Sequence, residues 1–353
     1  MSESLPTVVL GGTGYVAGEL LRLIAAHPRL SLAAVVSDSK PGASVAESFP
    51  HLAPCYGDTR FAALDAAVEL VSRTRDSAVF CAAPHGSAAP ALDRLLTAAA
   101  TAGTRPRVVD ISADFRFADP ARYQSVYGHP HPAPDRLKEF TCALPEHLES
   151  LATPHVAHPG CFASAMLLAL VPLLKLELIE PEVFVAGITG STGSGRTPST
   201  TTHHPLRHAD LYSYSALKHR HAPEVVAIVK AQAGVAPALH FVAHSGPFAR
   251  GIHVTVQARL ARAISEAELL ARLSGFYAAQ PFVQVRAEPP RLKEVVASNY
   301  ARIGAAVNGD TVAALVVLDN LTKGAAGGAV QWMNRLKGWD STLGLTAPAA
   351  GWT

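Results

Sequence analysis

A cysteine stands at the start of an apolar run in the segment AHPGCFASAMLLAL, residues 157–170. Pro159 and Gly160 interrupt the chain just before a series of good helix formers, and this pattern predicts a helix over 161–176 with Cys161 in its first turn. The helix dipole favours a thiolate over a thiol at this end, and the thiolate is the nucleophilic form. A buried cysteine that packs as a small apolar side chain is the alternative interpretation. The place at a helix start favours the nucleophile.

Two histidines could exchange protons with such a nucleophile. His219 and His221 lie in the segment ALKHRHAPEV, residues 216–225, at the predicted start of a helix over 221–232. A thiolate nucleophile requires a proton partner, and an imidazole titrates near neutral pH, so it can act as acid and as base. A solvated helix start that carries charged side chains is the alternative interpretation.

Residues 7–40 predict a unit that binds a dinucleotide. They alternate a short β-branched strand, a glycine turn, an amphipathic helix that begins near Tyr15, and a second strand at 32–36. Such a turn lets the backbone approach a pyrophosphate closely, and the helix start offers unpaired N–H groups. Any tight connection between strand and helix favours glycine, so the turn alone is weak support. The segment SDSK, which follows the second strand where ribose recognition belongs, strengthens the prediction.

Two further strands are predicted at 78–82 and 107–111, with a helix over 88–102 between them. This alternation predicts an α/β fold with a doubly wound parallel sheet of the Rossmann type. The loops AAPHGSA and DISADFR follow the carboxyl ends of these strands, the edge at which open α/β sheets bind ligands. His85 and Asp110 lie in these loops and could approach a cofactor, although a helix start and a turn explain them as well.

The rest of the chain predicts a different architecture. Residues 120–150 are rich in Pro, His and Tyr and are expected to form loops and short turns that close the first domain near residue 158. Beyond this boundary the pattern predicts a mostly antiparallel sheet with helices on one face, an α+β domain. Its expected strands cover 183–189, 239–243, 252–260 and 312–318, and its expected helices cover 161–176, 221–232 and 265–278.

Composition and charge limit the classes of protein and of binding partner that the chain fits. The 353 residues are 49% hydrophobic and 16% charged, which suffices for two globular domains with a core in each. The net charge of +2, without dense runs of Lys or Arg, disfavours a nucleic-acid partner, and no apolar stretch approaches the roughly 20 residues of a membrane helix. No spacing organises the 16 histidines into a complete set of metal ligands, so no metal is predicted. Four cysteines without a disulfide pattern, and no leader segment, predict a cytoplasmic protein.

Eight short sequence motifs follow one another along nearly the full chain. They are GGTGYVAGEL, PHG, DISADFR, HPGCFA, GSTGSGR, HRHAPEV, GPFARGIHVTVQARL and LDNLTKGAAGGAVQWMN. Taken together, these segments resemble the N-acetyl-gamma-glutamyl-phosphate reductase family, whose members are relatives of aspartate-semialdehyde dehydrogenase. The resemblance implies NADPH-dependent reductive dephosphorylation of N-acetyl-gamma-glutamyl phosphate to N-acetyl-glutamate 5-semialdehyde in arginine biosynthesis. It also implies that Cys161 forms a thioester and that His221 acts as acid and base.

The resemblance further implies domain bounds and site residues. It divides the chain into a dinucleotide-binding domain over 1–157 and a catalytic and oligomerisation domain over 158–324, with a C-terminal helix at about 325–353 that packs on the first domain. The implied cofactor-binding residues are Gly11, Thr13, Gly14, Tyr15, Val16, Ser37, Ser39, Lys40, Pro84, His85, Gly86 and Asn320. The implied substrate-binding residues are His219, Glu224, Arg196 and Arg250. Either arginine could bind an anionic group of the substrate through its planar fork, or form a surface ion pair instead.

Several alternatives stay open. Ser37, Ser39 and Lys40 would hold NADPH, whereas Asp38 could accept a hydrogen bond from the ribose of NADH. The histidine-rich segment 197–214 contains HHP, which is similar to sister enzymes of lysine biosynthesis that reduce a carrier-bound aminoadipyl phosphate. A cysteine hydrolase would not need the glycine turn, and a non-catalytic NADPH sensor would not need the thiol. The expected substrate is a small acyl phosphate, and the expected assembly is a homodimer or homotetramer built on the second-domain sheet.

Overall fold

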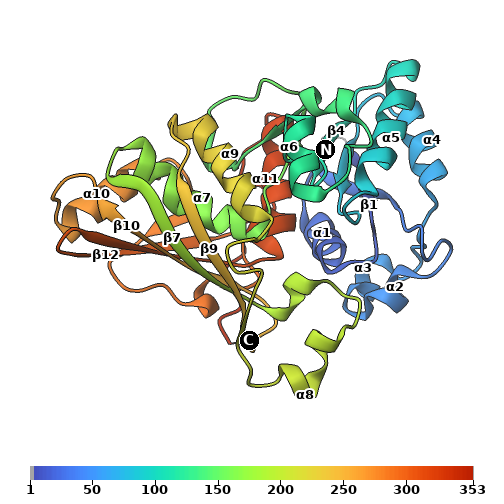
Figure 1. Cartoon of the computed structure of the whole chain (residues 1–353). Helices are drawn as coiled ribbons and strands as arrows, with labels where there is room; N and C mark the ends of the chain where they lie inside the picture. Colours follow the sequence, from blue (N-terminus) through green and yellow to red (C-terminus); the bar gives the residue numbers. More distant parts are fainter. Residues whose placement is uncertain (1–3, 353) are drawn as a thin grey trace. The chain divides into compact units, whose positions relative to one another are not determined.

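The computed structural model describes residues 4–352, which form two compact units (Figure 1). The first unit contains the described residues up to Pro145, Ser150–His158 and Ala326–Thr346. The second unit contains Glu146–Glu149, Pro159–Ala325 and the described residues from Ala347 onward. None of the helices in the described range is long and apolar enough to cross a membrane.

The first unit is built on a six-stranded sheet with strand order β2-β1-β3-β4-β6-β5, and all of these neighbours run parallel. Its inner strands β1, β3, β4 and β6 are short apolar segments that are almost entirely buried, as a parallel sheet between helices requires, whereas the outer strands β2 and β5 are partly exposed. This confirms the predicted doubly wound parallel sheet. The strands are β1 (Leu5–Leu10), β2 (Leu30–Val35), β3 (Ala78–Cys81), β4 (Arg107–Asp110), β5 (Phe140–Cys142) and β6 (His155–Ala157).

Helices cover both faces of this sheet. Val8, Val79 and Val108 point to one face and share a core cluster with α4 and α5. Helix α1 packs against β2, and α11 packs against both α1 and β4. The helices of this unit are α1 (Tyr15–Ala26), α2 (Val45–Ser48), α3 (Ala53–Tyr56), α4 (Leu64–Arg73), α5 (Ala88–Ala102), α6 (Pro120–Tyr127) and α11 (Gly327–Leu336).

The stretch 120–150 differs from the prediction, because it contains helix α6 and strand β5 as well as loops and turns. The Asp119 carboxylate caps α6 by accepting a hydrogen bond from the Ala121 backbone N–H at 2.9 Å. Pro120 occupies the first turn, and Gly128 ends the helix with a φ of 81°. The prediction of loops and short turns was wrong for these residues, because a favourable cap, an initial proline and a terminal glycine outweigh their loop-like composition.

Helix α11 belongs to the first unit, to which the chain returns over Ala326–Thr346. Its Asn334 side chain accepts a hydrogen bond from His27 Nε2 at 3.0 Å, which ties it to the end of α1. The helix ends at Leu336, and Gly338 follows with a φ of 65°. The helix is therefore shorter than the predicted span of about 325–353, because the left-handed conformation at this glycine is typical of a chain leaving a helix.

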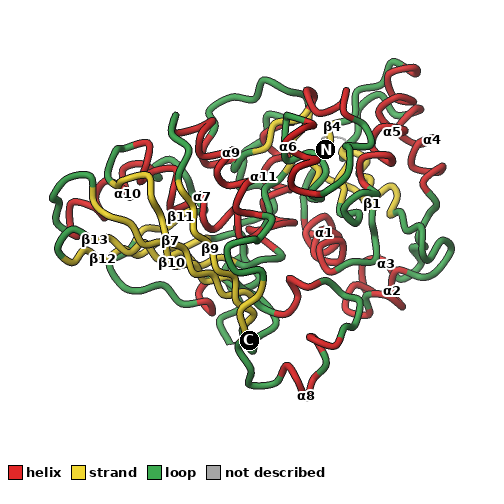
Figure 2. The backbone as a smooth tube through the Cα atoms, in the orientation of Figure 1, coloured by secondary structure: helices red, strands yellow, loops and turns green. Residues whose placement is uncertain are grey.

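The second unit is built on a mixed seven-stranded sheet with the order β11-β12-β13-β10-β7-β9-β8 (strands in yellow, Figure 2). The β11/β12 and β7/β9 neighbours are parallel and the other neighbours are antiparallel, which confirms the predicted mostly antiparallel α+β architecture. The strands are β7 (Ile179–Thr189), β8 (Tyr212–Tyr214), β9 (Ala238–Ser245), β10 (Ile252–Leu260), β11 (Val283–Val285), β12 (Ala301–Asn308) and β13 (Thr311–Leu318).

One face of this second sheet packs against a long apolar helix. Along β10, the fully buried Ile252 and Val254 alternate with the half-buried His253 and Thr255, which is the period of a strand covered on one side. Helix α7 contacts β7, β10 and β13 and supplies the cover. The helices of this unit are α7 (Cys161–Lys175), α8 (His204–Arg207), α9 (His221–Ala233) and α10 (Glu266–Phe276). Both units also contain short 3-10 helices, which are η1 (Pro50–Leu52), η2 (Pro134–Glu139), η3 (Pro145–His147), η4 (Ser191–Ser194), η5 (Thr200–Thr202) and η6 (Leu292–Glu294).

Acid is expected to destabilise the first unit through His155 on β6. Burial, with smaller contributions from Arg107 and Arg136, lowers the pKa of His155 to about 4, although Glu139 lies 4.0 Å from its Nε2. A histidine in an unfolded chain has a pKa of about 6.5, so the unfolded chain binds more protons between these values and the free energy of unfolding falls as the pH falls through this window. Urea unfolding at pH 7 and pH 4.5 should show a smaller acid-induced loss for His155→Gln than for the wild type. Equal losses would contradict this assignment.

Candidate active site

Cys161 is the first residue of α7, where its local sequence predicts it. Gly160 is the N-cap with extended backbone, φ −62° and ψ 156°, and it has no side chain with which to cap the first turn. The first-turn N–H groups are therefore adjacent to the thiol, and they favour its thiolate form. The cysteine is half-buried, so it keeps some exposure to a substrate. This is a suitable environment for a nucleophile.

Glu224 holds the residue that precedes the cysteine. It lies in the first turn of α9, which packs along α7, and it is fully buried. Its Oε1 accepts a hydrogen bond from the Gly160 backbone N–H at 2.7 Å. A charged acceptor makes such a bond strong, so it fixes the chain where α7 begins. The structure thus gives Glu224 a positioning contact, and its predicted contact with substrate stays a prediction.

The two predicted histidines lie together beside the cysteine helix. Their ring centres are 4.7 Å apart, and the Phe162 ring lies edge-on to both, 5.7 Å from His219 and 6.4 Å from His221. Burial, with a smaller contribution from Arg220, lowers the pKa of His219 to about 4, so this ring is neutral at pH 7. Its Nδ1 accepts the His221 backbone N–H at 3.2 Å, which assigns the ring proton to Nε2. His219 therefore offers a fixed hydrogen-bond donor, while His221 is the candidate acid and base.

Tyr214 is a site residue that the sequence analysis did not single out. It ends the edge strand β8, and its ring centre lies 5.6 Å from that of His219. Burial raises the pKa of Tyr214, and the charge of Cys161 is the next contribution in the same direction, which places hydroxyl and thiol within electrostatic reach. A neutral hydroxyl near the thiol can donate a hydrogen bond to a reacting oxygen. The only sequence signal is YSY within the histidine-rich segment 197–214.

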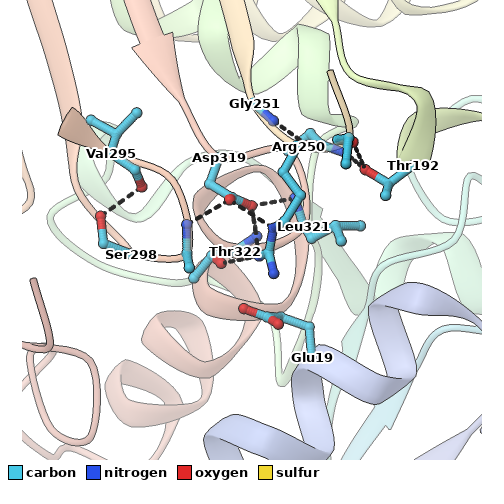
Figure 3. Close-up of polar contacts among 12 residues, drawn as sticks. Glu19, Thr192, Arg250, Gly251, Val295, Ser298, Asp319, Leu321 and Thr322 are labelled. Carbon is cyan, nitrogen blue, oxygen red and sulfur yellow. Dashed lines mark hydrogen bonds and ion pairs between the residues drawn. The ribbon is translucent and has the colours of Figure 1, made fainter. Parts of the chain in front are cut away.

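Arg250 is joined to a buried carboxylate (Figure 3). Its Nε and Nη2 donate to the two carboxylate oxygens of Asp319 at 3.0 Å each, and Nη2 also donates to Thr322 Oγ1 at 3.0 Å. Asp319 accepts further hydrogen bonds from backbone N–H groups at Ala297, Leu321 and Thr322. The planar fork that was expected to bind substrate thus binds Asp319 in this structure, although Arg250 keeps 24% exposure. Its substrate contact stays a prediction.

Asn320 links two loops of the second unit. Its Oδ1 accepts the Gly251 backbone N–H at 2.8 Å, and its Nδ2 donates to Thr192 Oγ1 at 3.0 Å. Both ends of the amide thus have a partner within the second unit, and the predicted contact of Asn320 with the cofactor stays a prediction. Arg196 lies just beyond η4, after Gly195 with a φ of 86°, and it is exposed.

A π-helical turn, η7 (Thr322–Ala326), packs directly on the cysteine. A Cβ added at Gly324 would lie 2.9 Å from Cys161 Cβ and 3.1 Å from Cys161 Cα. The Gly324 backbone N–H donates to the Asp319 carbonyl at 2.9 Å, so the turn is anchored at the same carboxylate residue that binds Arg250. Single π-turns occur frequently at functional sites. In the sequence this turn corresponds to the glycine-rich segment KGAAGG.

Gly324→Ala is therefore expected to displace Cys161. The new methyl group would meet the Cα and Cβ of the cysteine, which cannot rotate away as a long side chain could. A displacement of about 1 Å at a reacting group can cost on the order of 10²-fold in rate, so we expect a loss of that size in kcat. The matched control is Gly275→Ala in α10, where an added Cβ meets nothing within 4 Å. Steady-state kinetics of both variants test this, and full activity of Gly324→Ala would contradict it.

The glycine turn after β1 fits a closely bound dinucleotide. Gly11 has a φ of 75°, and a Cβ there would lie 2.4 Å from the Ala83 backbone, so only glycine is accommodated. Gly14 caps α1, and a Cβ at this position would meet nothing within 4 Å. Open space at a helix N-terminus fits the phosphates of a dinucleotide. The other predicted residues of this turn are Thr13, Tyr15 and Val16, of which Tyr15 is exposed.

The loop after β3 is held by a buried carboxylate that the sequence analysis did not select. Asp114 accepts hydrogen bonds from His85 Nδ1 at 2.6 Å and from the Gly86 backbone N–H at 2.9 Å. Gly86 has a φ of 83° and follows the predicted cofactor residues Pro84 and His85. The sequence analysis named the other aspartate of the segment DISADFR, Asp110, which is also buried, and burial raises its pKa to about 6.

The segment after β2 presents polar groups at the carboxyl edge of the sheet. Ser37 is buried, and its Oγ accepts the Lys40 backbone N–H at 3.2 Å and lies 3.3 Å from Ser39 Oγ. Ser39, Lys40 and Asp38 are exposed. Two hydroxyl groups and one ammonium group are suitable donors for a phosphate, so these residues fit the additional phosphate of NADPH.

Known proteins share this two-unit architecture. Residues 7–140 match the family model "Semialdehyde dehydrogenase, NAD binding domain", and residues 161–320 match "Semialdehyde dehydrogenase, dimerisation domain". Aspartate semialdehyde dehydrogenase II from Vibrio cholerae has a TM-score of 0.66 at 16% identity, covering 95% of this chain and 98% of its own. A probable aspartate-semialdehyde dehydrogenase from Pseudomonas aeruginosa has a TM-score of 0.68 at 17% identity, with 95% and 99% covered. The fold defines a protein of the semialdehyde dehydrogenase class.

Sequence comparison narrows this class further. An N-acetyl-gamma-glutamyl-phosphate reductase from Rhodospirillum rubrum is 37% identical over 354 residues, which is 98% of each chain. A protein of the same name from Ectopseudomonas mendocina is 38% identical over 348 residues, 97% of this chain and 98% of that one. The chain belongs to the N-acetyl-gamma-glutamyl-phosphate reductase family, which confirms the resemblance drawn from its eight segments.

Proposed function

We propose that this protein reduces N-acetyl-gamma-glutamyl phosphate to N-acetyl-glutamate 5-semialdehyde with NADPH and releases inorganic phosphate, as a step of arginine biosynthesis. The observation that carries the proposal is Cys161 at the start of α7 with His219 and His221 packed against the adjacent Phe162. Full-length similarity to relatives named for this reaction supports the choice of substrate.

The first half of the reaction uses the thiolate. Cys161 Sγ attacks the acyl carbonyl carbon, a C–S bond forms, and the C–O bond to phosphate breaks with its electron pair leaving on phosphate. The product is a thioester, and division into two steps lowers the barrier of a difficult displacement. Tyr214 and the Nε2–H of His219 are the candidate donors to the carbonyl oxygen as it becomes negative.

The second half uses the acid and base. NADPH, when bound, supplies the hydride that reduces the acyl carbon. His221 gives a proton to the oxygen that becomes negative, then removes this hydroxyl proton as the C–S bond breaks, so that aldehyde and Cys161 thiolate are released. A positioned imidazole contributes roughly 10²–10⁴-fold to such a step.

The first unit supplies the residues that would hold the cofactor. The turn at Gly11 and Gly14 and the start of α1 would bind the pyrophosphate. Ser37, Ser39 and Lys40 would bind the additional phosphate of NADPH, and a comparison of kcat/KM with NADP⁺ and NAD⁺ tests this preference. A higher kcat/KM with NAD⁺ than with NADP⁺ would indicate instead that Asp38 binds the ribose of NAD⁺.

The proposal extends to assembly and location. We place the protein in the cytoplasm as a homodimer or homotetramer, with subunits joined through the sheet of the second unit. The match of residues 161–320 to a dimerisation domain supports association of two or more copies. Sedimentation analysis of the purified chain separates these two assemblies.

The reverse reaction tests the proposed activity. Phosphate, NADP⁺ and N-acetyl-glutamate 5-semialdehyde should give reduced nicotinamide, measured by its absorbance, with the wild type. Turnover that requires both phosphate and a thiol at 161 is the expected result. Activity only on the aminoadipate homologue that is one carbon longer, free or carrier-bound, would assign the protein to lysine biosynthesis instead. Absence of phosphate-dependent oxidation with every aldehyde would overturn the mechanism.

A further inference from the structure

A buried ion pair in the second unit has no part in this chemistry. Lys323 and Glu146 are both fully buried, and Lys323 Nζ lies 2.5 Å from Glu146 Oε1. The Lys323 ammonium also lies 5.7 Å from the centre of the Phe282 ring. Removing two charges from water is costly, and two apolar side chains of similar volume are often equally stable. This pair therefore suggests a role in fixing geometry as well as in stability.

Lys323 belongs to the turn that packs on the nucleophile. It is the second residue of η7 and directly precedes Gly324, whose backbone leaves no space for a Cβ beside Cys161. Any shift of Lys323 along the chain axis would therefore move the backbone that borders the thiol. The contact with Glu146 limits such a shift, because a short ion pair has a single favourable geometry.

The residue next to Glu146 reaches the cysteine helix itself. His147 Nε2 lies 2.8 Å from Tyr277 Oη, and Tyr277 Oη donates to the Leu168 carbonyl of α7 at 2.7 Å. That carbonyl would ordinarily accept an N–H four residues later, at position 172, where Pro172 has none. The Tyr277 hydroxyl therefore satisfies a carbonyl that the proline leaves open, and because its single proton is used there, His147 is the donor to Tyr277.

We propose that the dipeptide Glu146-His147 is a positioning clamp for Cys161. Glu146 holds the π-turn against the thiol through Lys323, and His147 holds α7 through Tyr277. The two arms leave adjacent residues of one short segment, so they fix the middle of α7, at Leu168, and the turn that packs on Cys161 relative to each other. The effect of the clamp on catalysis rests on the proposed reductase function.

The test replaces the ion pair without leaving an unpaired buried charge. The double variant Glu146→Leu with Lys323→Met keeps the volume and is expected to retain a melting temperature near that of the wild type. Its kcat should fall at least tenfold with less than a threefold change in KM, because a misplaced thiolate affects the reaction more than binding. Tyr277→Phe removes only the hydroxyl of the second arm and should lower kcat in the same way, by about threefold or more.

A second readout is independent of the assigned reaction. Iodoacetamide alkylates thiolates, and peptide mapping can compare Cys161 with the exposed Cys55 of the first unit in the same sample. The rate ratio of Cys161 to Cys55 should change at least threefold in the double variant. The matched control is Glu294→Gln with Arg302→Met, an ion pair of 2.6 Å elsewhere in the second unit, which should change neither kcat nor the ratio.

The outcomes separate the two proposals. If the wild type lacks the proposed reductase activity, that function fails, while the alkylation ratio still decides on the clamp. A ratio within 1.5-fold of the wild type in a folded double variant would overturn the clamp, and so would a kcat within twofold in both the double variant and Tyr277→Phe. If the double variant does not fold, Tyr277→Phe decides by the same two measurements.

Discussion

Cys161→Ser is expected to lower kcat by at least about 10⁴-fold, which is the order of loss that follows removal of a covalent nucleophile. A serine hydroxyl does not ionise near neutral pH, and the helix start that favours a thiolate cannot compensate for this difference. The side chains have similar volumes and the position is half-buried, so the fold should persist. The phosphate-dependent reverse reaction measures the loss, and thermal unfolding checks the fold.

The control for this variant is Cys55→Ser. Cys55 is exposed in α3 of the first unit, and its replacement should leave kcat unchanged. Activity of Cys161→Ser within tenfold of the wild type would exclude a thioester intermediate. Retained dinucleotide binding in the same variant would show that the two units perform separable tasks.

His221→Asn is expected to lower kcat by roughly 10²–10⁴-fold with a small change in KM, because the variant removes proton transfer but keeps a polar side chain of similar size. His221 is the first residue of α9, and its ring packs against Phe162, the residue next to Cys161. Steady-state measurements from pH 5 to 9 should show this loss at each pH.

His219→Gln is the informative comparison for that variant. The pKa of His219 is lowered to about 4, mainly by burial, so His219 does not titrate between pH 5 and 9. The shape of the pH–rate profile should therefore survive this change, although kcat falls through the loss of a donor. A profile that changes shape in His219→Gln and not in His221→Asn would exchange the roles of the two histidines.

Much of the fold follows from short-range signals in the sequence. Alternating and helical periodicity predicted most of the longer strands and helices within a few residues, because these patterns depend on neighbours along the chain. Strand β12 was not predicted. The prediction of loops over 120–150 neglected the cap at Asp119, which was present in the sequence. The pairing order of the sheets required the structure, since each strand pair joins residues far apart in the chain.

Some features of the candidate site likewise follow from the sequence, and others required the tertiary structure. The sequence by itself determined that Cys161 begins a helix, that two histidines lie at another helix start and that a glycine turn follows the first strand, because each depends on residue type and on the start of a helix. Only the tertiary structure decided that Arg250 binds Asp319, that Gly324 borders Cys161, and that Glu146 meets Lys323 across a sequence separation of 177. Those contacts join segments without local sequence signals, and packing of the buried core brings them together.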